Sequence, residues 1–229
     1  MDTIRVVTAS LRTPWLEARR ADWRRRAQQP GELLYVALGD SAAQGVGTSD
    51  LDASYVGLLE ARLQRQTGRS VRVVNLSRYG ARVEDVIDEQ LPQLADLSPD
   101  LLTVTAGAND MRRFDRGEFS VDLELLLGAL PPHAIVADLP CFHFGPRELD
   151  AVIASRMIAD RVRAHRLALA PLHRVTEFRR GWGSVPDFSW DQFHPSARGY
   201  RVWESAFAGP VTRRAAHLPA IDPSRDARG

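Results

Sequence analysis

Short apolar runs alternate with longer segments of helical periodicity along most of this chain, and that alternation constrains the fold most strongly. The apolar runs have the length and the aliphatic content of buried strands. They occupy residues 32–38, 71–76, 101–105 and 134–139, with a weaker fifth run at 172–178. The helical segments occupy residues 54–66, 82–94, 121–130, 147–169 and 196–213. Strands that alternate with helices predict a parallel sheet covered by helices on both faces.

The 229 residues fit one large α/β domain with additions at its ends. Residues 1–31 form the first addition, and a helix is expected at 14–27 with Pro14 in its first turn. Its Arg-rich face could lie on a membrane, but the apolar face is narrow. We therefore expect Trp15 and Trp23 to pack on the domain while the arginines stay in water. The domain itself spans 32–214, and the tail 215–229 is expected to be disordered.

Polar motifs follow three of the predicted strands. Residues 39–41 read Gly-Asp-Ser, residues 75–80 contain Asn75 and Gly80, and residues 107–110 read Gly-Ala-Asn-Asp. The carboxyl ends of parallel strands meet at one edge of a sheet, where ligands bind in such folds. A fourth motif, Asp-Gln-Phe-His at 191–194, precedes the last predicted helix. The sequence therefore predicts one site built from four separate segments.

These motifs supply the groups that acyl transfer requires. Ser41 is a weak nucleophile until a base removes its proton, and His194 is the candidate base. Asp191 would accept a hydrogen bond from the other ring nitrogen of that histidine. The backbone N–H groups of Ser41 and Gly80 and the side-chain amide of Asn109 are candidates for an oxyanion hole. Each motif alone has a structural explanation, as a turn or a helix cap, so the prediction rests on their conjunction.

At these four motifs the chain resembles the SGNH hydrolases, an esterase and lipase superfamily also called GDSL hydrolases. The resemblance covers about residues 33–213, and Ala42 stands where many members have leucine. It implies a flavodoxin-like three-layer α/β/α sandwich with a five-stranded parallel sheet. It also implies ester hydrolysis through an acyl-enzyme on Ser41, with no cofactor and no metal.

The substrate stays open, because the superfamily includes esterases, lysophospholipases, thioesterases, carbohydrate deacetylases and acyltransferases. We expect a small-molecule, lipid or carbohydrate ester. Phe142, His143 and Trp190, in the loops at 140–146 and 188–190, are candidates for contact with it, although these aromatic residues could equally fill the core. Cys141, the single cysteine, is either a redox-sensitive neighbour of the site or a small buried apolar residue.

Other classes of function are disfavoured. A formal net charge of +1 gives no field that points to nucleic acid. No apolar stretch approaches the roughly 20 residues that span a bilayer, and the first residues lack a signal-peptide pattern, so a cytoplasmic protein without stable membrane insertion is expected. A metal hydrolase is disfavoured because the sequence has no paired histidines at ligand spacing. An α/β-hydrolase proper is disfavoured because no Gly-x-Ser-x-Gly motif surrounds Ser41. A silent binding module on the same fold is a further alternative, and the intact Ser41, Asp191, His194 and Asn109 argue against it.

Overall fold

Five parallel strands form a single sheet in the order β2-β1-β3-β4-β5. The structure, a computed structural model, describes residues 2–143 and 146–218, with side chains from residue 14 onward except at position 182. The strands are β1 (Leu33–Gly39), β2 (Val71–Asn75), β3 (Leu101–Thr105), β4 (Ile135–Ala137) and β5 (Ala168–Ala170). Val36 in the central strand is paired with Val74 on one side and Leu102 on the other. The predicted flavodoxin-like parallel sheet is confirmed.

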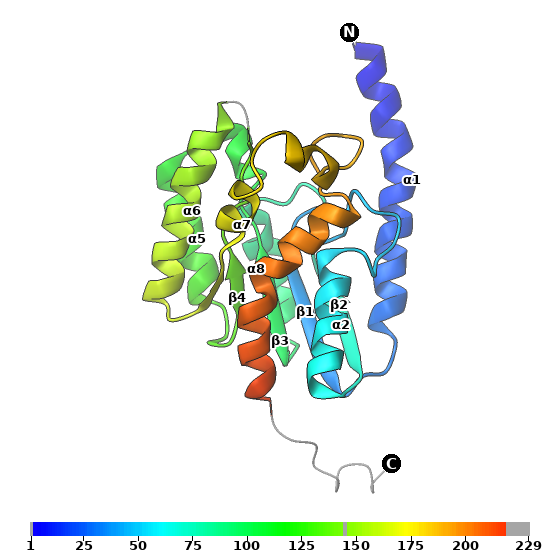
Figure 1. Ribbon diagram of the computed structural model, residues 1–229, viewed down its shortest axis with the longest axis vertical. Coiled ribbons are helices and arrows are strands. Elements are labelled where there is room, and N and C mark those ends of the chain that lie inside the picture. The colour runs from blue at the N-terminus through cyan, green and yellow to red at the C-terminus, as the bar shows by residue number, and fades with distance from the viewer. Residues whose placement is uncertain (1, 144–145, 219–229) are drawn as a thin grey trace, which may run out of the picture.

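Helices cover both faces of the sheet, because side chains of β1 alternate between two cores. Tyr35 and Ala37 lie in one apolar cluster, whereas Val36 and Leu38 lie in the other. The first cluster is covered by α2 (Tyr55–Thr67), α7 (Leu172–Glu177) and α8 (Ala197–Ala216). The second is covered by α3 (Val83–Asp85), the π-turn η1 (Val86–Gln90), α4 (Leu91–Leu94), α5 (Arg116–Gly128) and α6 (Arg147–Ala164). Figure 1 shows α2 and α8 in front of the strands.

The prediction was wrong about the fifth strand. Residues 172–178 were expected to form it, but Leu172–Glu177 is the helix α7, and the strand is Ala168–Ala170. Leu172 and Thr176 are both buried, which fits a helical spacing of four residues. The strand itself has three residues and, in the described part of the chain, pairs with β4 alone. Its sequence pattern is too short to separate it from the helix before it.

Two further helices differ from their predicted form. The helix expected at 82–94 contains the π-turn η1 in its middle. The helix expected at 121–130 begins at Arg116, because Asp115 caps it and accepts hydrogen bonds from the N–H groups of Gly117 and Glu118.

The first helix, α1 (Asp2–Ala27), begins earlier than predicted and holds Pro14 inside it rather than in its first turn. It lies along the edge strand β2, and its N-terminal half extends past the sheet (Figure 1). Trp23 is buried as expected, but Trp15 is 38% exposed. Arg19 was expected in water, yet it is buried, stacks on the Trp15 ring and donates a hydrogen bond to the carbonyl of Thr48.

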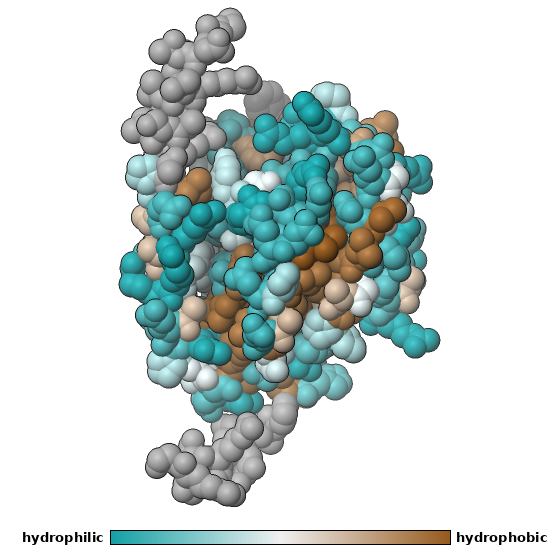
Figure 2. All heavy atoms as spheres, turned by 180° about the vertical axis from the view of Figure 1, so that it is seen from behind, coloured by the Kyte–Doolittle hydropathy of each residue, from teal (hydrophilic) through white to brown (hydrophobic). Residues whose placement is uncertain are grey.

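The surface away from α2 and α8 is mixed in character. Figure 2 shows a band of apolar side chains there, surrounded by hydrophilic ones. No helix within residues 2–143 and 146–218 combines the length and the apolar character that crossing a membrane requires. The last helix continues to Ala216, and most of the tail that was expected to be disordered lies outside the described residues.

Candidate active site

Ser41 follows the central strand in a turn that the neighbouring elements hold in place. Gly39 has a φ of 144°, and a Cβ atom there would lie 2.2 Å from the carbonyl oxygen of Thr105 on β3. Only glycine fits this close approach. The side chain of Gln90, in η1, accepts a hydrogen bond from the Gly39 N–H and donates one to its carbonyl, both at 2.8 Å. These contacts fix the backbone two residues before Ser41.

The second motif supports the residues that follow Ser41. The Asn75 amide donates to the carbonyl of Ala43 at 2.7 Å, and its oxygen accepts from the N–H of Ser77 at 3.1 Å. Gln44 in turn donates to the carbonyl of Ser77 at 2.9 Å. Asn75 therefore ties the segment after β2 to the turn after β1, a structural role that its place in the motif did not reveal.

The predicted serine, histidine and aspartate form one continuous chain of hydrogen bonds. His194 Nε2 lies 2.9 Å from Ser41 Oγ, and His194 Nδ1 lies 2.6 Å from Asp191 Oδ2. The other carboxylate oxygen of Asp191 accepts hydrogen bonds from the backbone N–H groups of Phe193 and His194, at 3.0 and 2.9 Å. Ser41 and His194 are both buried, so solvent competes little for this contact.

The surroundings of Asp191 favour its ionised form. Burial by itself would raise the pKa of Asp191, but the hydrogen bonds from His194 and Phe193 outweigh it and hold the pKa below its ordinary value. The carboxylate can therefore keep the proton of a neutral His194 on Nδ1. That tautomer leaves Nε2 as an acceptor facing the hydroxyl of Ser41.

The three predicted oxyanion donors line the same hollow as Ser41. The backbone N–H groups of Ser41 and Gly80 donate to no residue in the described part of the chain. Gly80 has a φ of 76°, a conformation that favours glycine. The Asn109 amide donates to the carbonyl of Ala81 at 3.0 Å and reaches Asp40 Oδ2 only at 3.4 Å. The contact with Asp40 is weak, and the Asn109 N–H that makes it is therefore the one available to a ligand.

Asp40 is a buried carboxyl group between the serine turn and Asn109. Its Oδ1 accepts a hydrogen bond from the N–H of Ala42 at 2.9 Å. Burial raises the pKa of Asp40 to about 7, and the nearby charge of Asp110 adds to this rise against the lowering effect of the Ala42 N–H. Nothing in the sequence distinguished Asp40 from an ordinary turn residue, because its burial arises only in the folded protein.

A cavity of about 710 Å³ opens beside the serine. Two of the residues proposed for substrate contact, Phe142 and His143, line it, whereas Trp190 is 82% exposed and is not among the described residues that do. Trp190 lies in the segment that the Phe188–Pro195 bridge closes. Phe188 and Phe193 from the same segment line the cavity instead.

The loop after β4 is held from behind by charged side chains. Arg180 donates to the carbonyl of His143 at 3.0 Å and pairs with Glu148, while Glu148 accepts from the N–H of Phe142 at 2.7 Å. Burial, more than any neighbouring group, raises the pKa of the Cys141 thiol to about 11. A thiol with such a pKa is a weak nucleophile at neutral pH, which favours the structural interpretation of Cys141.

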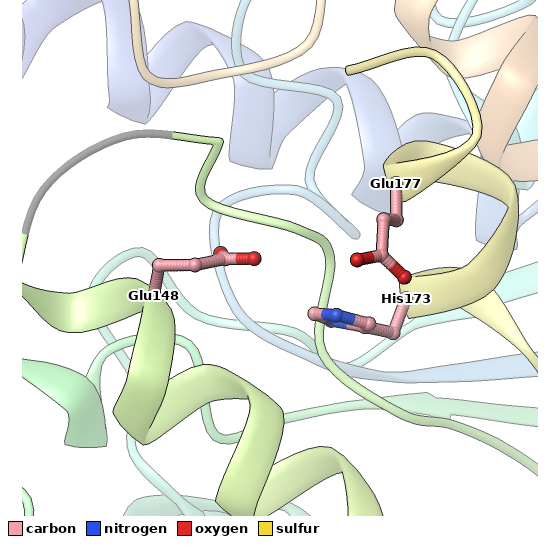
Figure 3. Close-up of side chains that lie close together, drawn as sticks. All are labelled: Glu148, His173 and Glu177. Atoms are coloured by element: carbon pink, nitrogen blue, oxygen red, sulfur yellow. The ribbon is translucent and has the colours of Figure 1, made fainter.

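Three side chains of metal-ligand type converge behind this loop. Glu148 points from α6 toward His173 and Glu177 on α7 (Figure 3), with their ligand atoms within 4.8 Å of one another. Arg180 pairs with both carboxylates, at 3.7 Å for Glu177, and so already supplies a compensating positive charge. We therefore interpret the cluster as a support for the loop.

Comparison with known proteins places this geometry in context. Residues 37–202 match the model of the GDSL-like lipase/acylhydrolase family. No curated protein sequence matches the chain. Many solved structures share its fold at low identity, and three of them serve as examples. A variant of an acetyl xylan esterase from Geobacillus stearothermophilus has 18% identity and a TM-score of 0.66, covering 79% of this chain and 94% of its own. The protein TesA has 23% identity and a TM-score of 0.64, and the match covers 79% of this chain and 99% of TesA. A lipase/acylhydrolase from Enterococcus faecalis has 19% identity and a TM-score of 0.64, and the match covers 83% of this chain and 99% of that protein.

Proposed function

Because this chain belongs to the GDSL-like lipase/acylhydrolase family, and is thus an ester-bond hydrolase, we propose that it cleaves carboxylic esters through an acyl-enzyme on Ser41. His194 is the general base, Asp191 orients it, and the N–H groups of Ser41, Gly80 and Asn109 stabilise the oxyanion. The observation that carries the proposal is the continuous chain of hydrogen bonds from Asp191 through His194 to Ser41.

The first half of the reaction forms the acyl-enzyme. His194 Nε2 takes the proton from the hydroxyl of Ser41 while Oγ bonds to the ester carbonyl carbon. The carbonyl electron pair moves onto its oxygen, where the three N–H donors stabilise the negative charge. The charge then returns to re-form the carbonyl, the bond to the alkoxy oxygen breaks, and the leaving alcohol takes the proton from Nε2.

The second half repeats these steps with water. His194 removes a proton from water as its oxygen bonds to the acyl carbon, and the same donors hold the second oxyanion. Collapse breaks the bond to Ser41 Oγ, which recovers its proton from His194, and the carboxylic acid leaves. An alcohol in place of water would give acyl transfer, and the same residues would serve.

The first experiment compares the wild type with Ser41→Ala on p-nitrophenyl esters from acetate to palmitate. Loss of the nucleophile removes covalent catalysis, so turnover should fall by at least about 10³-fold. Labelling by a fluorophosphonate should disappear at the same time. The acyl-chain length that the wild type hydrolyses fastest indicates the length of the acyl pocket.

The matched control is Ser205→Ala, because the Ser205 hydroxyl lies on α8 and contacts only the Val202 carbonyl among the described residues. It should keep both turnover and labelling. Labelling that survives in Ser41→Ala would overturn the assignment of Ser41. Ester product in preference to acid, when alcohol is added, would establish a transferase.

A further inference from the structure

The cavity beside Ser41 has two chemically different walls. Arg112 and Arg147 line it from η2 (Asp110–Arg113) and from the first turn of α6. These two elements contact each other, and Arg112 follows Asn109 by three residues, so we treat the part of the cavity that they line as one wall. The wall contributed by the segment before His194 carries Val185, Phe188 and Phe193 instead.

The two arginines of this wall have no acidic partner among the described residues. Within the described residues, neither the Arg112 nor the Arg147 guanidinium forms a hydrogen bond or an ion pair, and both side chains are exposed. A third arginine of the cavity, Arg179, differs because it binds Asp187 through two nitrogens. The two unpaired guanidinium groups therefore remain available to an anion from solution.

The carboxylates of the cavity are already engaged. Asp191 binds His194, and Asp187 is shared by Arg179 and Arg198. Asp40, the third acidic residue that lines the cavity, accepts hydrogen bonds from the Ala42 N–H and, weakly, from the Asn109 amide. Glu148, beside Arg147 in α6, pairs with Arg180 and accepts from the N–H of Phe142. A substrate that brings its own negative charge would supply the partner that the protein does not.

The composition does not account for this placement. All 30 basic residues of the chain are arginine, so the choice of arginine over lysine carries no weight. The position of each arginine is informative, because the adjacent Arg113 lines a separate hollow together with the carboxylates of Glu84, Asp115 and Glu118. Of two consecutive arginines, one faces acidic groups and the other faces the cavity of Ser41.

We propose that this site prefers esters that carry an anionic group, a carboxylate or a phosphate, bound by Arg112 and Arg147. The apolar part of such an ester would lie against Phe188 and Phe193 on the opposite wall. This inference rests on the proposed reaction at Ser41 and names the substrate class of that same site.

The test compares matched pairs of esters that differ in charge. The mono-p-nitrophenyl ester of glutaric acid is paired with p-nitrophenyl valerate, and 4-(valeryloxy)phenyl phosphate is paired with phenyl valerate. The first pair places a carboxylate on the acyl group, and the second places a phosphate on the leaving group. In at least one pair, we expect a higher kcat/KM for the charged ester at low salt. High salt should reduce the preference, because it screens exposed charges.

The double variant Arg112→Gln/Arg147→Gln should lower the ratio of charged to neutral kcat/KM about tenfold, chiefly through KM. The control Arg113→Gln removes the same charge from the same short helix outside the cavity, so it should leave the ratio unchanged. A wild-type ratio of one or less in both pairs, or an equal ratio in the double variant, would overturn the inference. In that case Ser41-dependent hydrolysis of valerate esters would leave the proposed function standing, whereas its absence together with absent labelling would refute both.

Discussion

His194 meets Ser41 across 153 positions of sequence, and a single unusual residue shapes the turn that makes this possible. Gln192 has a φ of 54°, in the left-handed backbone region that residues other than glycine and asparagine rarely adopt. With that conformation, the segment from Asp191 to His194 closes tightly enough for one carboxylate to bind both the backbone and the ring of the histidine. Backbone strain at such a position is typical of residues that hold a reactive group in place.

Asp191→Asn should lower kcat by about 10³- to 10⁴-fold with little change in KM. The amide would donate to His194 Nδ1 instead of accepting from it, which puts the ring proton on Nε2 and removes the base that faces Ser41. Steady-state kinetics on a p-nitrophenyl ester measure the effect. Asp160→Asn, on the exposed part of α6, is the control. A loss of less than tenfold in Asp191→Asn would contradict the proposed role of Asp191.

Asp40 should make the free energy of unfolding depend on pH. Burial raises its pKa from the ordinary 3.8 to about 7 in the folded protein, so between these values the unfolded chain loses a proton that the folded one keeps. The contribution of Asp40 to stability is therefore complete below about pH 4 and is lost as the pH rises toward 7.

Urea unfolding at pH 5 and pH 8 checks this expectation. Wild type should lose about 2.5 kcal/mol more than Asp40→Asn between these pH values. Asp110 and Asp138, whose pKa values burial raises to about 6, titrate in both proteins, so most of their contribution cancels in the comparison. Parallel stability curves for the two proteins would contradict the raised pKa of Asp40.

Among the elements, the π-turn η1 has a direct connection to the site. It widens the helix between α3 and α4 and brings the Gln90 side chain to both polar groups of Gly39. A π-turn inside a helix is uncommon and frequently accompanies a functional site. A regular α-helix at 82–94, as the sequence predicts, would direct that side chain differently, since the π-turn changes the rotation of every residue after it.

Gln90→Ala should lower the free energy of unfolding by about 2–4 kcal/mol, because it leaves a buried N–H and a buried carbonyl without partners. Urea denaturation measures the loss. Gln93→Ala is the matched control, because Gln93 is exposed and donates only to the Glu89 carbonyl among the described residues, so a change within about 0.5 kcal/mol is expected. Equal effects of the two substitutions would show that Gln90 does not support the turn.

For the whole molecule, the open question is how α1 relates to the domain. The division at residues 31 and 32 remains a prediction, and Trp23 bears on it directly. The indole is buried in the same cluster as Tyr35 and Tyr55, and its N–H donates to the carbonyl of Gln44 at 3.1 Å. Arg26, one turn later, pairs with Asp52 and Glu60 of the segment around α2. These contacts make the second half of α1 part of the first core.

Trp23→Ala should therefore destabilise the protein by about 3–5 kcal/mol, as expected for a large aromatic side chain in a packed core. Trp15→Ala, on the same helix but with an exposed ring, should cost less than about 1 kcal/mol. Thermal and urea unfolding of both variants compare the two. A Trp23→Ala variant as stable as wild type would show that α1 is a separable extension.

Patterns along the chain were enough to predict the parallel sheet, the order of the motifs and the residues that meet at Ser41, because each is encoded locally in period, turn chemistry and residue type. These patterns misplaced the fifth strand and the start of α5, where the elements are short or depend on a cap. The hydrogen bonds of Gln90 to Gly39, the burial of Asp40 and the two cavity arginines without an acidic partner in the described part of the chain became visible in the folded protein alone. Each of these depends on which distant segments pack together, and a pattern along the chain does not record that.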